Sequence, residues 1–154
     1  MEVIIRKAGI EDAGSLACIL GGLGGFAAFE HEDAESSTER VRRHLDLCLA
    51  DDSHSVYVAE TAGSILGYVS VHWLPYLILA GPEGYVSELF VQEEGHGQGL
   101  GTHLLEAVKA EARQRGCSRL MLLNNRGRES YRRQFYTKNG WQERPEMANF
   151  IDRL

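Results

Sequence analysis

Apolar residues along the first part of the chain follow patterns that predict one short strand and two helices. Residues 3–5 form an apolar run typical of a strand. From Ile10 onward, apolar residues recur at helical spacing until the glycine pair at residues 21–22 interrupts the pattern. Residues 36–39 read Ser-Ser-Thr-Glu, a capping sequence that predicts the start of a second helix.

The rest of the chain alternates between strand and helix patterns. Residues 55–60 and 64–73 are rich in β-branched and aromatic side chains and are separated by a short polar turn, which predicts a hairpin. The expected elements after this hairpin are a strand over residues 84–91, a helix over 98–115, a strand over 117–123, a helix over 129–139, and strands from Trp141 onward. The order β-α-α-β-β-β-α-β-α-β predicts an α/β fold with a mixed sheet and helices on both faces.

Length and composition fit a single domain over residues 1–154. The chain is 44% hydrophobic and 25% charged, which is ordinary for a soluble globular protein. It shows no internal repeat, no leader sequence and no apolar run long enough to span a membrane. The three cysteines are widely spaced and set among apolar residues, which favours reduced thiols in a cytoplasmic protein.

The net charge of the chain and its possible metal ligands limit which partners it is expected to bind. The formal net charge of −6 repels phosphate backbones and disfavours nucleic acid as a partner. His44 and Cys48 lie four residues apart on a predicted helix, but no further Cys or His completes a metal site. No metal is therefore expected.

A glycine-rich turn between a predicted strand and a predicted helix is the strongest feature. Gly97, Gly99 and Gly101 alternate there, so the backbone can turn tightly and approach a ligand closely. The first N–H groups of a helix have no internal partners and carry the positive end of its dipole. Together these features are typical of a cradle for a diphosphate.

Two other phosphate-binding motifs fit this turn less well. A Walker loop ends in Gly-Lys-Ser/Thr, a tripeptide that the chain lacks. In a dinucleotide-binding fingerprint, Thr102 would occupy the place of the third glycine, and no acidic residue follows near position 120. A glycine-rich turn that binds no ligand is the remaining alternative.

Two segments resemble the signatures of the GNAT superfamily of N-acetyltransferases. Residues 96–101 match Arg/Gln-x-x-Gly-x-Gly/Ala, with His96 in place of the usual Arg or Gln. Residues 135–141, Phe-Tyr-Thr-Lys-Asn-Gly-Trp, match the second signature, in which an Asn often found seven residues before the Tyr is replaced by Glu129. The two signatures occur in the family's order, and the resemblance covers about residues 88–141.

This resemblance implies an enzyme that moves an acetyl group from acetyl-CoA to a primary amine by direct attack. The acetyl thioester would lie in a splay between neighbouring strands. The residues that the resemblance assigns to acetyl-CoA are Leu89, Phe90 and Val91 along the pantetheine arm, His96, Gly97, Gln98, Gly99, Leu100, Gly101 and Thr102 at the diphosphate, and Asn124 after the following strand.

The same resemblance names two catalytic candidates. Tyr136 would be the general acid that protonates the leaving thiolate, and a core aromatic is the alternative reading. Glu88 lies between Val86 and Phe90 on one face of an apolar strand, which suits a general base for the amine. A buried Glu that is hydrogen-bonded to a neighbouring turn fits that pattern equally well, with a water chain acting as the base.

The substrate implied is a small-molecule or peptide amine, and a homodimer is left open. Acidic residues gather at positions 30–35, where they would attract an amine to the mouth of the site or form only a solvated loop. A catalytically silent domain that senses acyl-CoA is the alternative function. Tyr136 is present, which favours the enzyme.

Overall fold

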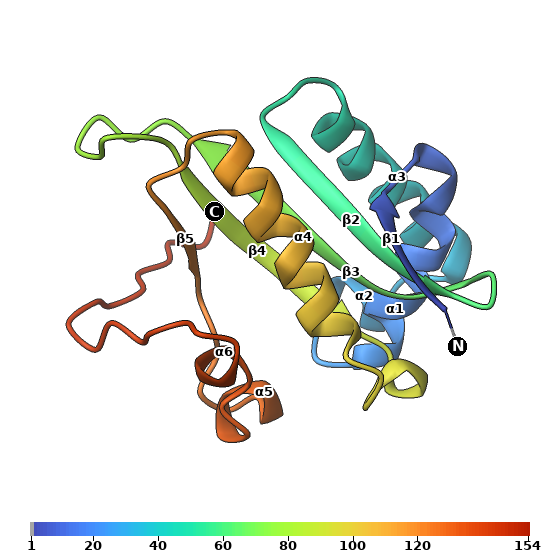
Figure 1. Cartoon of the computed structure of the whole chain (residues 1–154). Coiled ribbons are helices and arrows are strands. Elements are labelled where there is room, and N and C mark those ends of the chain that lie inside the picture. The colour runs from blue at the N-terminus through green and yellow to red at the C-terminus, as the bar shows by residue number, and fades with distance from the viewer. Residues whose placement is uncertain (1) are drawn as a thin grey trace. The chain divides into compact units, whose positions relative to one another are not determined.

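The computed structural model describes residues 2–154, which divide into two compact units, residues 2–122 and 123–154 (Figure 1). The elements of the first unit are β1 (Val3–Lys7), η1 (Ile10–Asp12), α1 (Ala13–Leu23), α2 (Ala27–Glu30), α3 (Ala34–Leu49), β2 (His54–Thr61), β3 (Ser64–Leu74), β4 (Glu83–Val91), η2 (Glu93–Gly95), α4 (Leu100–Gln114) and β5 (Arg119–Leu122). The second unit contains α5 (Glu129–Arg132) and α6 (Phe135–Lys138).

One five-stranded sheet in the order β1-β2-β3-β4-β5 forms the centre of the first unit. Neighbouring strands from β1 to β4 are antiparallel, and β5 is parallel to β4. The predicted hairpin is formed by β2 and β3, and its two turn residues have positive φ, 50° at Ala62 and 79° at Gly63. The predicted class, an α/β fold with a mixed sheet, is confirmed.

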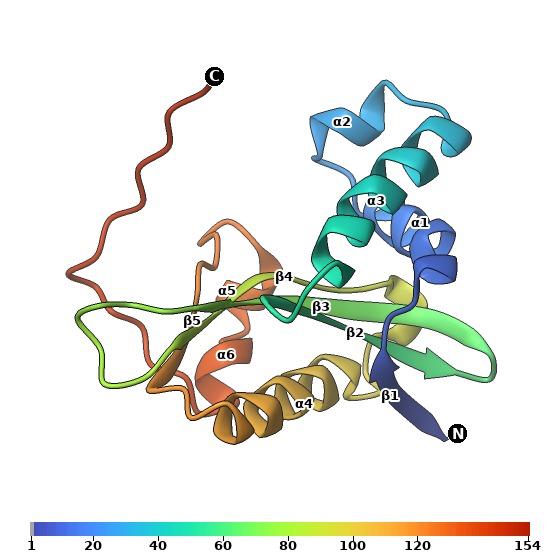
Figure 2. The ribbon, with the colours of Figure 1, turned by 90° about the horizontal axis from the view of Figure 1, so that it is seen from above.

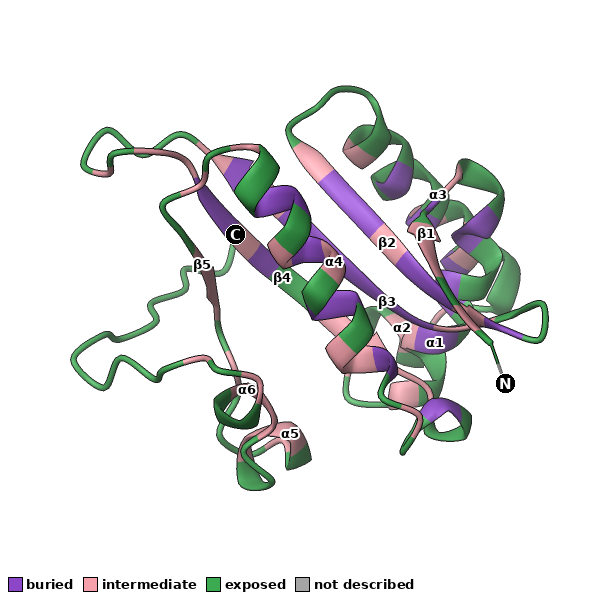
Figure 3. Cartoon of the chain, viewed as in Figure 1, coloured by how far each residue is buried: buried purple, intermediate pink, exposed green. Residues whose placement is uncertain are grey.

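Helices cover both faces of this sheet. Figure 2 shows α1 and α3 on one face and α4 on the other, as the element contacts also show. On the first face, Val58 and Tyr68 pack into the core formed with α1 and α3. On the α4 side, Leu104 and Val108 are fully buried, and Figure 3 shows the buried positions continuing along β2 and β3. The sheet is therefore the rigid centre of this unit.

Two helix boundaries differ from the prediction. α1 continues through the glycine pair at residues 21–22 and ends at Gly24, where φ is 68°. α3 begins at Ala34, earlier than predicted, because the Asp33 side chain accepts a hydrogen bond from the Ser36 amide at 2.7 Å. Asp33 therefore caps this helix in place of the serines that follow it.

The second unit departs more from the prediction. The helix expected over residues 129–139 is two single turns, α5 and α6, separated by a residue with left-handed backbone, Gln134 at φ 57°. The strands expected from Trp141 onward are absent, since residues 141–154 contain neither helix nor strand. This tail is poor in β-branched residues and contains Pro145, which lacks a backbone donor.

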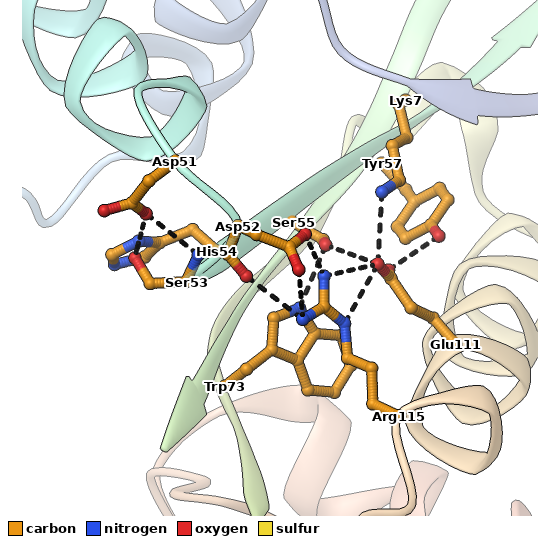
Figure 4. A network of polar contacts seen from close by, with 10 residues as sticks. All are labelled: Lys7, Asp51, Asp52, Ser53, His54, Ser55, Tyr57, Trp73, Glu111 and Arg115. Atoms are coloured by element: carbon orange, nitrogen blue, oxygen red, sulfur yellow. Dashed lines mark hydrogen bonds and ion pairs between the residues drawn. The ribbon is translucent and has the colours of Figure 1, made fainter. Parts of the chain in front are cut away.

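A polar network joins α4 to the sheet around the Glu111 carboxylate (Figure 4). The Glu111 side chain is 9% exposed and accepts four side-chain donors. They are Lys7 Nζ at 3.1 Å, Ser55 Oγ at 2.9 Å, Tyr57 OH at 2.7 Å and Arg115 Nη2 at 3.1 Å. Burial by itself would raise the pKa of Glu111, but these donors together lower it below the ordinary value of 4.5.

We expect Glu111→Gln to lower the free energy of unfolding at pH 7 by about 2–3 kcal/mol, because the donors around it lose a charged acceptor. Since the native pKa of Glu111 is depressed, its contribution is complete above pH 4.5 and is lost as the pH falls through the native pKa. The advantage of the wild type over the variant should therefore shrink in acid. Urea denaturation at several pH values measures this difference.

Glu106→Gln is the matched control for this prediction. Glu106 lies on the same helix and pairs with Lys109 at 2.9 Å, but its side chain is 55% exposed. We expect its replacement to cost less than about 1 kcal/mol at any pH. Equal losses for the two variants would contradict the structural role given to Glu111.

Candidate functional site

Strand β4 is paired with a strand on both sides only over its first half. Residues Glu83 to Val86 pair with β5, whereas pairing with β3 continues to Val91. Within the five-stranded sheet, the stretch from Ser87 to Val91 therefore has a strand on one side only. Leu89, Phe90 and Val91 lie on this stretch, as the predicted pantetheine site requires. The free edge can hydrogen-bond an extended ligand through the backbone.

A β-bulge marks the point where β4 leaves β5. Ser70 lies opposite Glu88 while Val71 lies opposite Val86, so Ser87 is the extra residue.

Glu88 sits just after the bulge, and its carboxylate is exposed. Its Oε2 accepts a hydrogen bond from the buried Tyr68 hydroxyl at 2.9 Å. The alternative of a buried Glu bonded to a turn is therefore wrong, because the partner is a strand tyrosine and the carboxylate reaches solvent. An exposed, oriented carboxylate remains compatible with the predicted role as a base.

The turn after β4 depends on glycines with left-handed backbone. Gly97 has φ 77° and Gly99 has φ 73°, values that residues with a side chain rarely adopt. No atom lies within 4 Å of the position that a Cβ would occupy at Gly97. Sequence reasoning missed Gly95, where a Cβ would come within 2.8 Å of Leu100 Cδ1. Gly95 thus lets the turn pack closely, and Gly97 and Gly99 set its direction.

The first turn of α4 leaves backbone donors without helical partners. The first intrahelical hydrogen bond runs from the His103 amide to the Gly99 carbonyl at 3.0 Å. The amides of residues 100–102 precede it and have no partner within the helix. This turn carries no acidic side chain that would compete for them. The combination suits an anion.

The two polar side chains of the turn fold back onto it. His96 Nε2 donates to the Val91 carbonyl at 3.1 Å, and Gln98 Nε2 donates to the Glu94 carbonyl at 2.9 Å. Because a carbonyl only accepts, Nε2 of His96 carries a proton. Both side chains brace the turn, so the backbone amides are the donors that it leaves for a ligand.

In the second unit, Tyr136 lies on α6 among aromatic rings. Its ring centroid is 5.0 Å from that of Phe135 and 6.1 Å from that of Trp141. α6 ends at Lys138, and Gly140, two residues further on, has φ 86°. The Trp141 amide closes the turn on the Tyr136 carbonyl at 3.0 Å.

The Tyr136 side chain is half-buried. Burial raises the pKa of Tyr136 to about 12. The hydroxyl therefore stays protonated at neutral pH and can act as a donor.

Asn124 and two residues of the predicted acidic loop, Glu32 and Asp33, are hydrogen-bonded to other residues of the chain. Asn124 Nδ2 donates to Ser130 Oγ at 3.0 Å within the second unit. In the acidic segment, Glu32 pairs with Arg40 at 2.9 Å and Asp33 caps α3. These two residues therefore support the fold, a role that neither the substrate-attracting nor the solvated-loop expectation included.

Within residues 2–154, no cluster of three or more His, Cys, Asp or Glu side chains is arranged to hold a metal ion. Over the same residues, no helix is both long and apolar enough to span a membrane.

Comparison with known proteins identifies the family. The model of the acetyltransferase (GNAT) family matches residues 26–141 of this chain. The chain belongs to the GNAT acetyltransferase family. This confirms the resemblance of the two signatures and supports acetyl transfer in general. GNAT enzymes generally use acetyl-CoA, which agrees with the diphosphate cradle predicted from the glycines.

One curated relative is also an acetyltransferase. An acetyltransferase of Agrobacterium fabrum is 32% identical over 104 residues, and the match spans 66% of this chain but only 65% of the relative's length.

Three solved structures superpose on nearly the whole chain. A transcriptional regulator from Bacillus halodurans has a TM-score of 0.85 at 21% identity, with 99% of this chain and 100% of that one covered. Glucosamine-6-phosphate N-acetyltransferase from Arabidopsis thaliana has a TM-score of 0.74 at 24% identity, with 99% and 100% covered. An aminoglycoside acetyltransferase from an uncultured soil metagenomic sample has a TM-score of 0.78 at 19% identity, with 99% and 96% covered. At these identities the likeness shows that the GNAT fold is shared.

Proposed function

We propose that this chain is an acetyl-CoA-dependent N-acetyltransferase that acetylates a primary amine by direct attack. The observation that carries the proposal is the junction of β4 and α4. There, a strand edge without a neighbour leads into a turn with left-handed glycines and then into helix amides without partners. Membership of the GNAT family supports acetyl transfer as the chemistry.

The groups at this junction match two parts of acetyl-CoA, the diphosphate and the pantetheine arm. Its diphosphate is anionic and fits the amides from Gly97 to Thr102, which need no basic side chain beside them. Its pantetheine arm is extended and carries amides, so it can pair with the backbone of Leu89 to Val91. When bound, acetyl-CoA supplies a thioester whose carbonyl carbon accepts a nucleophile.

Glu88 and Tyr136 have the properties that the two proton transfers need. The exposed Glu88 carboxylate can take a proton from the incoming ammonium, and its bond from Tyr68 fixes its orientation. The Tyr136 hydroxyl is protonated at neutral pH and can give its proton to the departing sulfur. Asn124 follows β5 and keeps its side-chain oxygen for a further contact to the pantetheine arm.

Charge favours a cationic amine as the substrate. The chain carries a formal net charge of −6, and Glu30 and Glu35 are exposed beside α2 and α3. The three cysteines are free thiols, in keeping with the proposed cytoplasmic location. We therefore propose a small-molecule or peptide amine as the acceptor.

A panel of amines with acetyl-CoA, followed by the release of free thiol, tests this function. The panel should contain polyamines, amino sugars, aminoglycosides, amino acids and peptides with free N-termini. We expect at least one amine to raise thiol release well above hydrolysis, with its acetylated product seen by mass spectrometry. Tight acetyl-CoA binding with no turnover of any amine would favour the silent sensor instead.

A further inference from the structure

A row of titratable side chains crosses the sheet near the β4 bulge. His54 on β2 lies opposite His72 on β3, and His72 lies opposite Tyr85 on β4. The two imidazole centroids are 4.4 Å apart, and the Tyr85 ring is 5.9 Å from His72. Directly opposite residues share a face, so all three side chains line one side of the sheet.

The bulge adds two consecutive β4 side chains to this same face. Ser87 Oγ lies 2.8 Å from His72 Nε2, and the Glu88 carboxylate is bonded to Tyr68 at 2.9 Å. His72 and Tyr68 are separated by an even number of positions on β3 and therefore share a face. In a regular strand, Ser87 and Glu88 would point to opposite faces. The extra residue brings both to one side at the point where β4 leaves β5.

The proposed reaction needs two proton acceptors on the amine side. An ammonium nitrogen loses one proton before it can attack and a second as the amide forms. The sulfur takes one proton from Tyr136, which regains a proton from solvent. Both acceptors then lose theirs to solvent, so the overall reaction releases one proton. Glu88 can hold only one of the two protons from nitrogen.

We propose that Ser87 and His72 form a relay that accepts the second proton. As the nitrogen–carbon bond forms and the carbon–sulfur bond breaks, the amine proton passes to Ser87 Oγ while the Ser87 proton passes to His72 Nε2. His72 becomes an imidazolium and then gives its proton to water. This proposal rests on the proposed function and adds the residues that complete its proton balance.

His72 is suited to this role because it is neutral at the pH of the reaction. Burial, and next the positive charge that His54 can carry, lower the pKa of His72 below the ordinary value of 6.5. The titratable groups beside its ring are His54 and Tyr85, and Glu88 follows Ser87 on the neighbouring strand. Neutral His72 has one unprotonated ring nitrogen, and the relay requires the tautomer in which this is Nε2, so that Ser87 donates to it. The other contact of Ser87 Oγ, to the Ser70 carbonyl, is longer at 3.5 Å.

Two substitutions break the relay at different links. His72→Gln keeps a hydrogen-bonding partner for Ser87 but cannot take up a proton, and Ser87→Ala removes the hydroxyl link. We expect each to lower kcat by about 10- to 100-fold, with the affinity for acetyl-CoA and the Tm retained. Because both act on one path, the double variant should be no slower than the slower single variant.

The pH profile provides a readout that a purely structural role would not change. Wild-type kcat should fall as the pH drops through the His72 pKa, because the protonated ring cannot accept. His72→Gln should lack this acid limb. His54→Gln is the matched control: its plateau kcat should equal that of the wild type, and its acid limb should move to higher pH because a neighbouring charge is gone.

The outcomes separate this relay from the function on which it rests. If the wild type acetylates no amine, the proposed function fails and the relay with it. If the wild type is active and His72→Gln matches it in kcat and keeps the same acid limb, the relay alone is overturned. Additive losses in the double variant would also contradict a single path through Ser87 and His72.

Discussion

Replacing Tyr136 with Phe is expected to lower kcat by about 10- to 1000-fold while acetyl-CoA affinity and the Tm change little. Phe keeps the ring and its packing against Phe135 and Trp141 but removes the transferable proton. Steady-state kinetics on an amine from the panel, with calorimetry for acetyl-CoA, measures both effects.

Tyr131→Phe is the control for the same substitution in the same unit. The Tyr131 hydroxyl donates to the Glu143 carboxylate at 3.1 Å and lies in the exposed part of the unit. We expect this variant to keep the kcat of the wild type. If Tyr136→Phe also kept full kcat, water rather than Tyr136 would be the proton donor. Loss of both stability and affinity would identify Tyr136 as a packing residue.

We expect Gly101→Val to weaken CoA binding by at least about 100-fold, because a branched side chain in the first turn of α4 would keep the diphosphate away from several charge-assisted amide contacts. Gly101 is the better position for this test than Gly99, since its backbone is helical and Gly99 has φ 73°. Valine at Gly99 would strain the turn itself. Isothermal titration with CoA gives the affinity, and thermal unfolding checks the fold.

Two controls separate crowding of the ligand from damage to the helix. Gly101→Ala should bind nearly as well as the wild type, because the family signature admits Ala at this place. Gly22→Val puts the same side chain into α1 at an exposed glycine with no atom within 4 Å of its Cβ position. It should leave stability unchanged or slightly raised, because valine has a higher helix propensity than glycine, and it should leave CoA affinity unchanged. Equal affinity for Gly101→Val and the wild type would contradict a diphosphate at these amides.

The junction of β4 and α4 was predictable because its signals are local. The β-branched and aromatic run of β4 ends at Val91 as expected, and the alternating glycines mark the turn. The predicted helix start at residue 98 was two residues early. The reason is also local, since Gly99 takes up left-handed backbone and the helix can begin only after it.

The surroundings of the proposed base could not be predicted from sequence. Tyr68 and Glu88 are twenty residues apart, and their contact depends on the register between β3 and β4. That register includes a bulge at Ser87, which no glycine marks in the sequence. The contact between His72 and Ser87 follows from the same bulge. Register depends on how two strands pair, so the sequence of one strand alone does not determine it.

The interruption in the second unit also lacked a sequence signal. Gln134 adopts left-handed backbone, which glycine or asparagine would normally supply, so the pattern over residues 129–139 reads as one helix. The glycine of the second signature was a usable signal, because Gly140 follows α6 with the positive φ that a glycine after a helix end often adopts.

Mapping the backbone amides during a titration with CoA tests the central claim most directly. In ¹H–¹⁵N NMR spectra, we expect the largest shifts at the amides of residues 97–102, with smaller shifts at residues 89–91. Pyrophosphate alone should move the first set and leave the second in place. Large shifts confined to other parts of the chain, or none at saturating CoA, would contradict the assignment of the β4–α4 junction as the acetyl-CoA site.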